Sequence, residues 1–334
     1  MRSRYRAPAG RRLSLIFSLL FGSLLFPILA DAEEFNHWLQ GLRRDAAAAG
    51  ISSQTLDETL GGIQPLAFVL RAQQRQPETT LTWEQYRKRV VSFDRQLRGR
   101  ELAAEHADEL RKVADQYGVQ ARFIVAFWGI ESDYGRNLGD VPVAAALATI
   151  AHGGRRQAYF RRELLELLRS IDAGHTPPGT VTGSWAGALG QCQFMPSNYR
   201  RHAVDGDGDG RRDIWGNKSD IFASIANFLA KLGWNDEQTW GRAVRIPADF
   251  DPRLAGLDVR MKLARWQDLG VRRLDGRNLP RRKDLWSNLL LPDGRSGEAF
   301  LVYDDFHTTM RWNRSTHFAL AVGILADAIA PALK

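Results

Sequence analysis

Apolar residues recur every three or four positions through most of the chain beyond residue 33, a spacing that predicts amphipathic helices. Gly50 and Gly118 follow such stretches at positions where a glycine commonly ends a helix, and Gly233 does the same for a helix over 220–232 with Ser219 or Asp220 as its cap. Residues 119–170 predict two or three further helices.

The pattern changes after Trp240, where short apolar runs alternate with Pro, Gly and Asp clusters. Such runs are typical of the strands of a small sheet. The expected strands are 243–246, 259–263, 289–291 and 300–303, and a last helix is expected over about 315–329. The pattern therefore predicts a mainly helical α+β protein with one small β-rich insertion.

The N-terminus has the three parts of a secretory signal peptide. Five arginines lie within the first 12 residues, residues 13–29 are apolar and uncharged, and Ala30-Asp31-Ala32 is a small-x-small cleavage site. We expect cleavage after Ala32, although a retained anchor is the alternative. No cysteine stands at the junction, which argues against a lipoprotein, and Arg11-Arg12 leaves Sec and twin-arginine export both open.

Composition narrows the function classes. The 334 residues are 44% hydrophobic and 25% charged, which is typical of a globular protein. A single cysteine excludes a disulfide framework and a multi-cysteine zinc site. The net charge of +8 is reduced once the arginine-rich leader is set aside, and nucleic-acid binding is not expected.

One glutamate stands at the end of an apolar helical stripe. Phe123, Phe127 and Glu131 are four residues apart and share a face. A carboxyl group desolvated there would have a raised pKa and could act as a general acid. Asp133 falls on another side of the helix. From these residues alone, a glutamate that faces water at a helix end is the alternative.

A glycine-rich segment follows about fifty residues later, at 183–197. Its small residues permit close backbone approach, and its amides and hydroxyl suit sugar hydroxyl groups; a tight structural loop is the alternative. We expect Cys192 within it to be a small buried residue rather than a reactive thiol.

An aspartate-rich loop fits the first seven positions of an EF-hand. Asp205, Asp207 and Asp209 alternate with glycines, and Arg211 would offer its backbone carbonyl. The twelfth position is Gly216 instead of Glu, so the standard motif fails there. A structural calcium ion is the expectation, with a simple Asp-Gly turn as the alternative.

Together these motifs resemble the lytic murein transglycosylase B family. Glu131-Ser132-Asp133-Tyr134-Gly135 and GSWAGALGQCQFMPSNY at 183–199 carry the resemblance, and WEQYRK at 83–88 and RWNRSTHFA at 311–319 add to it. It covers roughly residues 35–330. It implies a lysozyme-like catalytic core over 118–240, an N-terminal helical lobe over 33–117, a small β-rich lobe over 241–305, and a C-terminal segment, 306–334, that returns to the core.

The resemblance also implies the chemistry. The family cleaves the MurNAc-GlcNAc bond of peptidoglycan without water and leaves a 1,6-anhydro ring. Glu131 matches its single acid and base, and no cofactor is needed. Further residues match positions that contact sugar in the family: Tyr86, Ser184, Gln193, Trp312 and Asn313. Its calcium loop closes with an aspartate that Asp220 matches. Trp312 and Phe318 stand where relatives have tyrosines.

Two alternatives differ in class. A hydrolytic muramidase would need a second carboxylate, for which Asp133 and Asp140 are the nearest candidates by sequence. A non-catalytic, calcium-dependent wall-binding protein would not need Glu131. The expected partner is the peptidoglycan glycan strand, with wall-synthesis proteins as further partners; the expected state is a monomer in the periplasm.

Overall fold

The computed structural model describes residues 26–73, 81–176, 181–282 and 285–333. The first 25 residues, and with them most of the predicted signal peptide, lie outside this range. The predicted cleavage site falls within the first described helix, α1 (Phe26–Ala48).

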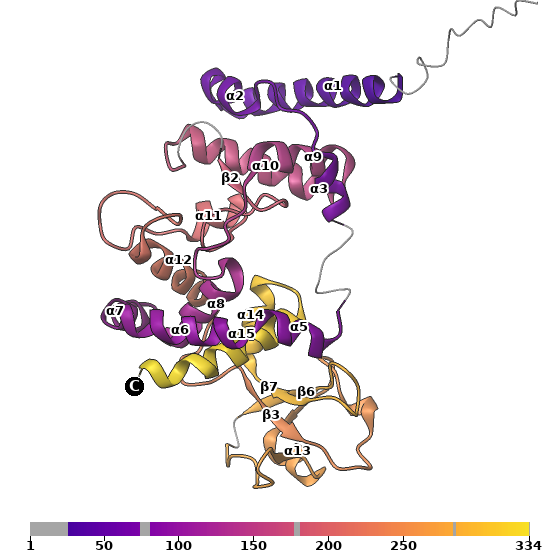
Figure 1. The fold of residues 1–334 in the computed structure, drawn as a ribbon, viewed down its shortest axis with the longest axis vertical. Coiled ribbons are helices and arrows are strands. Elements are labelled where there is room, and N and C mark those ends of the chain that lie inside the picture. The colour runs from indigo at the N-terminus through magenta and orange to yellow at the C-terminus, as the bar shows by residue number, and fades with distance from the viewer. Residues whose placement is uncertain (1–25, 74–80, 177–180, 283–284, 334) are drawn as a thin grey trace, which may run out of the picture.

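One group of helices forms the upper end of the molecule in Figure 1. Helices α1, α2 (Ser53–Leu60) and α3 (Ala67–Ala72) pack against α9 (Val143–Gly153) and α10 (Gln157–Asp172). A short antiparallel pair, β1 (Val141–Pro142) and β2 (Thr182–Gly183), adjoins α9. Segments far apart in the sequence therefore share this end.

A second group surrounds α8 (Ala121–Ser132), the helix that carries Glu131. It comprises α5 (Trp83–Val90), α6 (Phe93–Glu105), α7 (Ala107–Tyr117), α12 (Lys218–Lys231), α14 (Asp304–Trp312) and α15 (Thr316–Ile329). The last described element is the short 3-10 helix η2 (Ala330–Leu333), and α11 (Pro196–His202) lies between α10 and α12. One continuous apolar core runs through both groups of helices.

The five-stranded sheet lies at the opposite end from α1 and α2 (Figure 1). Its order is β4-β6-β7-β3-β5, antiparallel throughout, with Leu289 opposite Leu301 and Val244 opposite Ala299. The strands are β3 (Gly241–Arg245), β4 (Arg260–Lys262), β5 (Arg272–Arg273), β6 (Trp286–Leu290) and β7 (Ala299–Val302), with η1 (Pro252–Leu254) and α13 (Leu263–Asp268) between them. This lobe has its own small core around Trp266 and Leu289.

The described helices divide differently from the predicted ranges. Helices from 33–117 do not form one lobe by themselves, because α1–α3 are covered by α9 and α10, whereas α5–α7 pack around α8 and α15. The prediction for the start of α12 was also wrong. The helix begins two residues before Asp220, because the Asn217 side chain accepts hydrogen bonds from the amides of Ser219 and Asp220.

Among the described residues, one helical stretch is long and apolar enough to cross a membrane, Thr316–Leu333. It contains α15, whose buried residues pack in the central core against α8. Burial inside the protein accounts for its apolar composition.

Candidate active site

Glu131 opens onto a cleft of about 1340 Å³. The cleft lies between the end of α8, the 183–199 segment, the start of α10 and the junction of α14 with α15. Its lining consists of Ala72, Glu131, Arg156, Tyr159, Ser184, Trp185, Gln193, Phe194, Met195, Asn198, Phe228, Arg311, Trp312, Asn313, Arg314, Ser315 and Thr316.

The expected apolar stripe of α8 leads to this cleft. Phe123 and Phe127 are fully buried, and Glu131, one turn further on, is partly exposed. Trp312 donates a hydrogen bond from its indole Nε1 to Glu131 Oε1 at 2.6 Å. The carboxyl group therefore has a fixed partner in the protein and access to whatever occupies the cleft.

The two other carboxylates named by sequence lie elsewhere. Asp133 is the left-handed residue that ends α8, and it forms ion pairs with Arg95 at 3.2 Å and Arg136 at 2.8 Å. Asp140 is exposed. Among the described residues, Glu131 is the one carboxylate that lines the cleft.

Ser184 and Gln193, which match sugar-contacting positions of the family, both line the cleft. The Ser184 hydroxyl accepts from the Ala188 amide at 3.0 Å, which leaves its proton available to a ligand. The Gln193 side-chain nitrogen donates to the carbonyls of Leu138 and Gly190, which orients the amide group.

Gly190 lets this segment approach the aspartate-rich loop. Its φ is +58°, and a Cβ there would lie 2.6 Å from the Ile214 carbonyl oxygen. The backbone amide of the neighbouring Gln191 donates to that carbonyl. The Gln191 side chain accepts a hydrogen bond from the Trp128 indole of α8 at 2.7 Å and donates one to the Trp215 carbonyl at 2.5 Å. The loop and the end of α8 are thereby tied together.

Trp312 and Asn313 line the cleft where α14 ends, but Tyr86 does not. Tyr86 is 2% exposed and packs against the rings of Trp83 and His317. The prediction that Tyr86 lines the cleft is therefore wrong, because α5 directs both of its aromatic residues, Trp83 and Tyr86, into the core.

Several residues that line the cleft were not identified from the sequence. Trp185, Asn198, Arg311 and Arg314 lie inside the quoted motifs, so their neighbours could have pointed to them. Arg156 and Tyr159 belong to no motif; the guanidinium of Arg156 lies 4.3 Å from the Tyr159 ring centre. The three arginines make the cleft cationic apart from Glu131.

Cys192 is fully buried behind the cleft, as expected. Burial raises the pKa of its thiol well above the usual value, and the charges of Glu131 and Asp220 raise it further. The thiol contacts the Ile221 carbonyl at 3.7 Å. It is a packing residue, not an exposed nucleophile.

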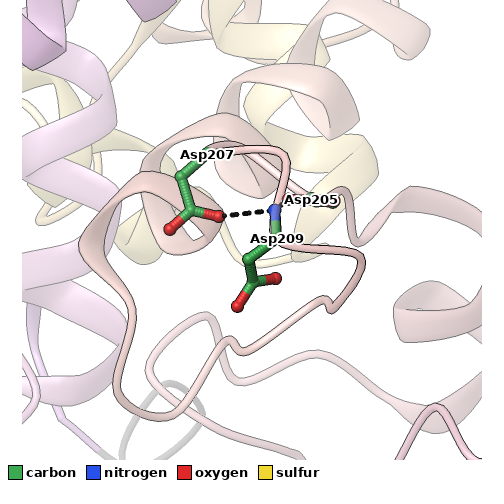
Figure 2. A group of neighbouring side chains, drawn as sticks. All are labelled: Asp205, Asp207 and Asp209. Carbon is green, nitrogen blue, oxygen red and sulfur yellow. Dashed lines mark hydrogen bonds between the residues drawn. The ribbon is translucent and has the colours of Figure 1, made fainter.

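The aspartate-rich loop brings three carboxylates together. Oxygens of Asp205, Asp207 and Asp209 lie within 4.8 Å of one another (Figure 2). Asp205 accepts from the amides of Gly208, Asp209 and Gly210, and these bonds, that from Gly210 above all, lower the pKa of Asp205. The Asp209 amide donates to Asp207.

Asp220 lies outside this group of three. It is fully buried, and its two oxygens accept from the amides of Gly206 and Asp213 at 2.7 and 2.5 Å. In this arrangement Asp220 fastens the loop to α12. The three clustered aspartates supply only oxygen ligands, which fit calcium. Arg211 adjoins them, since its backbone N–H donates a hydrogen bond to Asp209 Oδ1 at 2.7 Å.

Comparison with known proteins decides the family. The family model described as Transglycosylase SLT domain matches residues 34–327. The chain belongs to this family. It is 32% identical over 303 residues to the membrane-bound lytic murein transglycosylase B of Escherichia coli K12, covering 84% of this chain and 79% of that protein.

Solved structures of family members agree with the fold. SltB3 from Pseudomonas aeruginosa, in complex with NAG-anhNAM-pentapeptide, is 42% identical with a TM-score of 0.84, over 89% of this chain and 79% of that one. Slt35 from Escherichia coli, in complex with calcium, is 29% identical with a TM-score of 0.75, over 90% and 94%. The predicted lysozyme-like, mainly helical fold is confirmed, and the protein is an enzyme of the lytic transglycosylase class, which cleaves glycosidic bonds.

Proposed function

We propose that the protein cleaves the β-1,4 bond between MurNAc and GlcNAc in peptidoglycan and leaves a 1,6-anhydro-MurNAc end. The observation that carries this proposal is that, among the described residues, Glu131 is the single carboxylate that lines the cleft. Ordinary retaining and inverting glycosidases, which hydrolyse the bond with water, use a pair of carboxylates. The complex of SltB3 with a NAG-anhNAM-pentapeptide is consistent with the same product.

Glu131 acts twice in the proposed reaction. Its protonated form gives the proton to the glycosidic oxygen as the bond from that oxygen to C1 breaks. The resulting carboxylate then takes the proton of the MurNAc C6 hydroxyl as O6 bonds to C1, which restores the acid. No water is consumed. Holding O6 close to C1 favours ring closure over attack by solvent.

The cleft supplies the groups that would hold the sugar. Ser184 has a hydroxyl proton to donate, Gln193 is oriented by two carbonyls, and Asn313 follows Trp312 on the same wall. The arginines of the cleft suit the carboxylates of stem peptides. Neither Asp133 nor Asp140 is among the residues that line the cleft, which disfavours a muramidase.

Two further proposals concern the setting of the enzyme. The predicted signal peptide, 1–32, supports export and a periplasmic location. The three aspartates of the loop support a structural calcium ion, held by Asp205, Asp207 and Asp209 with the Arg211 carbonyl, as Slt35 has been seen in complex with calcium. Bound calcium would neutralise the clustered carboxylates and supply no chemistry to the cleft.

The test is Glu131→Gln, assayed by clearing of purified cell-wall sacculi. Glutamine keeps the size of the side chain but cannot transfer a proton, so we expect activity to fall by about 10²–10⁴-fold, with an unchanged melting temperature. Asp140→Asn, which removes an exposed carboxylate outside the cleft, is the matched control and should keep full activity. Substantial activity in Glu131→Gln would contradict the assignment.

A further inference from the structure

In the hydrogen bond between Trp312 and Glu131, Trp312 can only be the donor. The indole Nε1 of Trp312 lies 2.6 Å from Glu131 Oε1. An indole N–H can only donate, whereas a tyrosine or serine hydroxyl could donate or accept. Oε1 must therefore act as the acceptor in this contact, whether Glu131 is ionised or protonated.

The indole is held by a cage of aromatic rings. Its centre lies 4.6 Å from Phe127, 5.3 Å from Phe194 and 4.7 Å from Phe228. These rings come from α8, the 183–199 segment and α12. His202 stacks behind Phe228 at 4.1 Å. Because the ring is packed from three elements, the N–H cannot turn away when Glu131 changes its protonation state.

We propose that Trp312 is a positioning residue that confines the acid proton of Glu131 to Oε2, so that one oxygen both gives and receives the proton. The carbonyl oxygen of a carboxylic acid accepts a hydrogen bond more strongly than its hydroxyl oxygen, so a proton on Oε1 would weaken the bond from the indole N–H, whereas a proton on Oε2 keeps it. This inference rests on the proposed function, in which Glu131 transfers the proton. It assigns Oε1 to orientation and Oε2 to chemistry.

The same bond favours the ionised carboxylate, because a donor stabilises the negative charge more than the neutral acid. The other ionisable groups of the cleft wall are Arg156, Tyr159, Arg311 and Arg314; the Cys192 thiol lies buried behind it, and the His202 imidazole stacks behind Phe228. Those groups stay in place when Trp312 alone is changed. A change in the pH dependence then reports the loss of the N–H.

The experiment replaces Trp312 in two ways. Trp312→Phe keeps an aromatic ring, and substitution with 3-benzothienylalanine keeps the bicyclic shape and removes only the N–H. Without the donor, the alkaline limb of kcat/KM should move up by about one pH unit, because the carboxylate loses stabilisation. The carboxyl C=O stretch of Glu131, assigned by infrared difference against Glu131→Gln, should move to higher frequency.

Trp185→Phe is the matched control, since Trp185 lines the same cleft and the Glu131 contact belongs to Trp312. It should keep the wild-type alkaline limb and C=O frequency, and melting temperatures verify that each variant is folded. Wild-type values of both readouts in the benzothienyl variant would overturn the proposal. If the Glu131→Gln variant keeps its activity, or still shows the carboxyl band assigned to Glu131, the proposed function on which this inference rests is overturned instead.

Discussion

Asp305 combines full burial with a carboxylate oxygen, Oδ2, that has no hydrogen-bond partner among the described residues. Its other oxygen accepts from the Asn235 amide at 2.9 Å. Burial raises the pKa of Asp305 to about 7, and the charges of Asp304 and Asp236 add to this effect against that of Arg122. The group therefore titrates near neutrality in the folded protein.

The sign of its effect on stability follows from proton binding. Between about pH 4 and pH 7 the native protein holds this proton while the unfolded chain releases it, so stability falls as the pH rises. The ionised group costs up to about 4 kcal/mol above this range. Asp305→Asn keeps an acceptor for Asn235, and we expect it to flatten the fall in unfolding free energy between about pH 4 and 7.

Denaturant unfolding at several pH values measures this. Asp304→Asn changes the exposed neighbour and should keep most of the wild-type decline. If Asp305→Asn declined with pH as steeply as the wild type, Asp305 would not be the group that titrates.

Among the residues of the site, those marked by a local pattern could be predicted from the sequence. Glu131 was identified because its helix face and its motif are local. The Trp312 partner was not, since the two residues are 181 positions apart and meet only when the end of α14 packs beside α8. Tyr86 matched a motif, but a motif does not tell which way α5 turns its aromatic face.

At the scale of elements, the aspartate-rich loop is the segment expected to depend on a metal. Three carboxylates within 4.8 Å of one another repel, and a bound cation removes this cost. Calcium that binds only the native state should raise stability by about 2.7 kcal/mol at a hundredfold excess over its dissociation constant. We expect a higher melting temperature with calcium than with a chelator.

The variant Asp209→Ala should lose this response, and Asp249→Ala, an exposed aspartate in another loop, should keep it. A wild-type melting temperature that does not change on chelation would show that the loop is a structural turn.

Helix α11 depends on a buried carboxylate from a different helix. Glu163 of α10 is 3% exposed and accepts from the amide and the hydroxyl of Ser197, at 2.9 and 2.8 Å, in the first turn of α11. This helix also carries Asn198 to the cleft. Glu163→Ala leaves both donors without an acceptor, and we expect a loss of about 1–3 kcal/mol in unfolding free energy.

Ser197→Ala removes only the hydroxyl bond and should cost less than Glu163→Ala. Equal losses in the two variants, measured by denaturant unfolding, would mean that the amide bond contributes nothing to the start of α11.

Helix ends and strands were predictable where the signal is local. Gly118 and Gly233 have positive φ just past α7 and α12, and four of the five sheet strands overlap their predicted ranges. The fifth, β5, spans only Arg272–Arg273 and exists because it pairs with β3, so no local pattern marks it. The start of α12 was misplaced because Asn217, rather than Ser219 or Asp220, provides the cap.

At the scale of the whole molecule, the cleft forms where distant parts of the chain meet. Helix α8 lies at mid-length in Figure 1, between the helical group with α1 and the sheet lobe. The grouping of α1–α3 with α9 and α10 could not be predicted, because several amphipathic helices could cover the same apolar faces equally well. The lysozyme-like class could be predicted, because the order of the motifs carried it.

The central claim is that one carboxylate suffices because the substrate supplies its own nucleophile. The most direct measurement is the mass of disaccharide-peptides released from purified sacculi in heavy-oxygen water, with Glu131→Gln as the blank. We predict products one water lighter than hydrolysis gives, without heavy oxygen and unchanged by borohydride. Products that carry the heavy oxygen and are reduced by borohydride would contradict the account and require a second catalytic group.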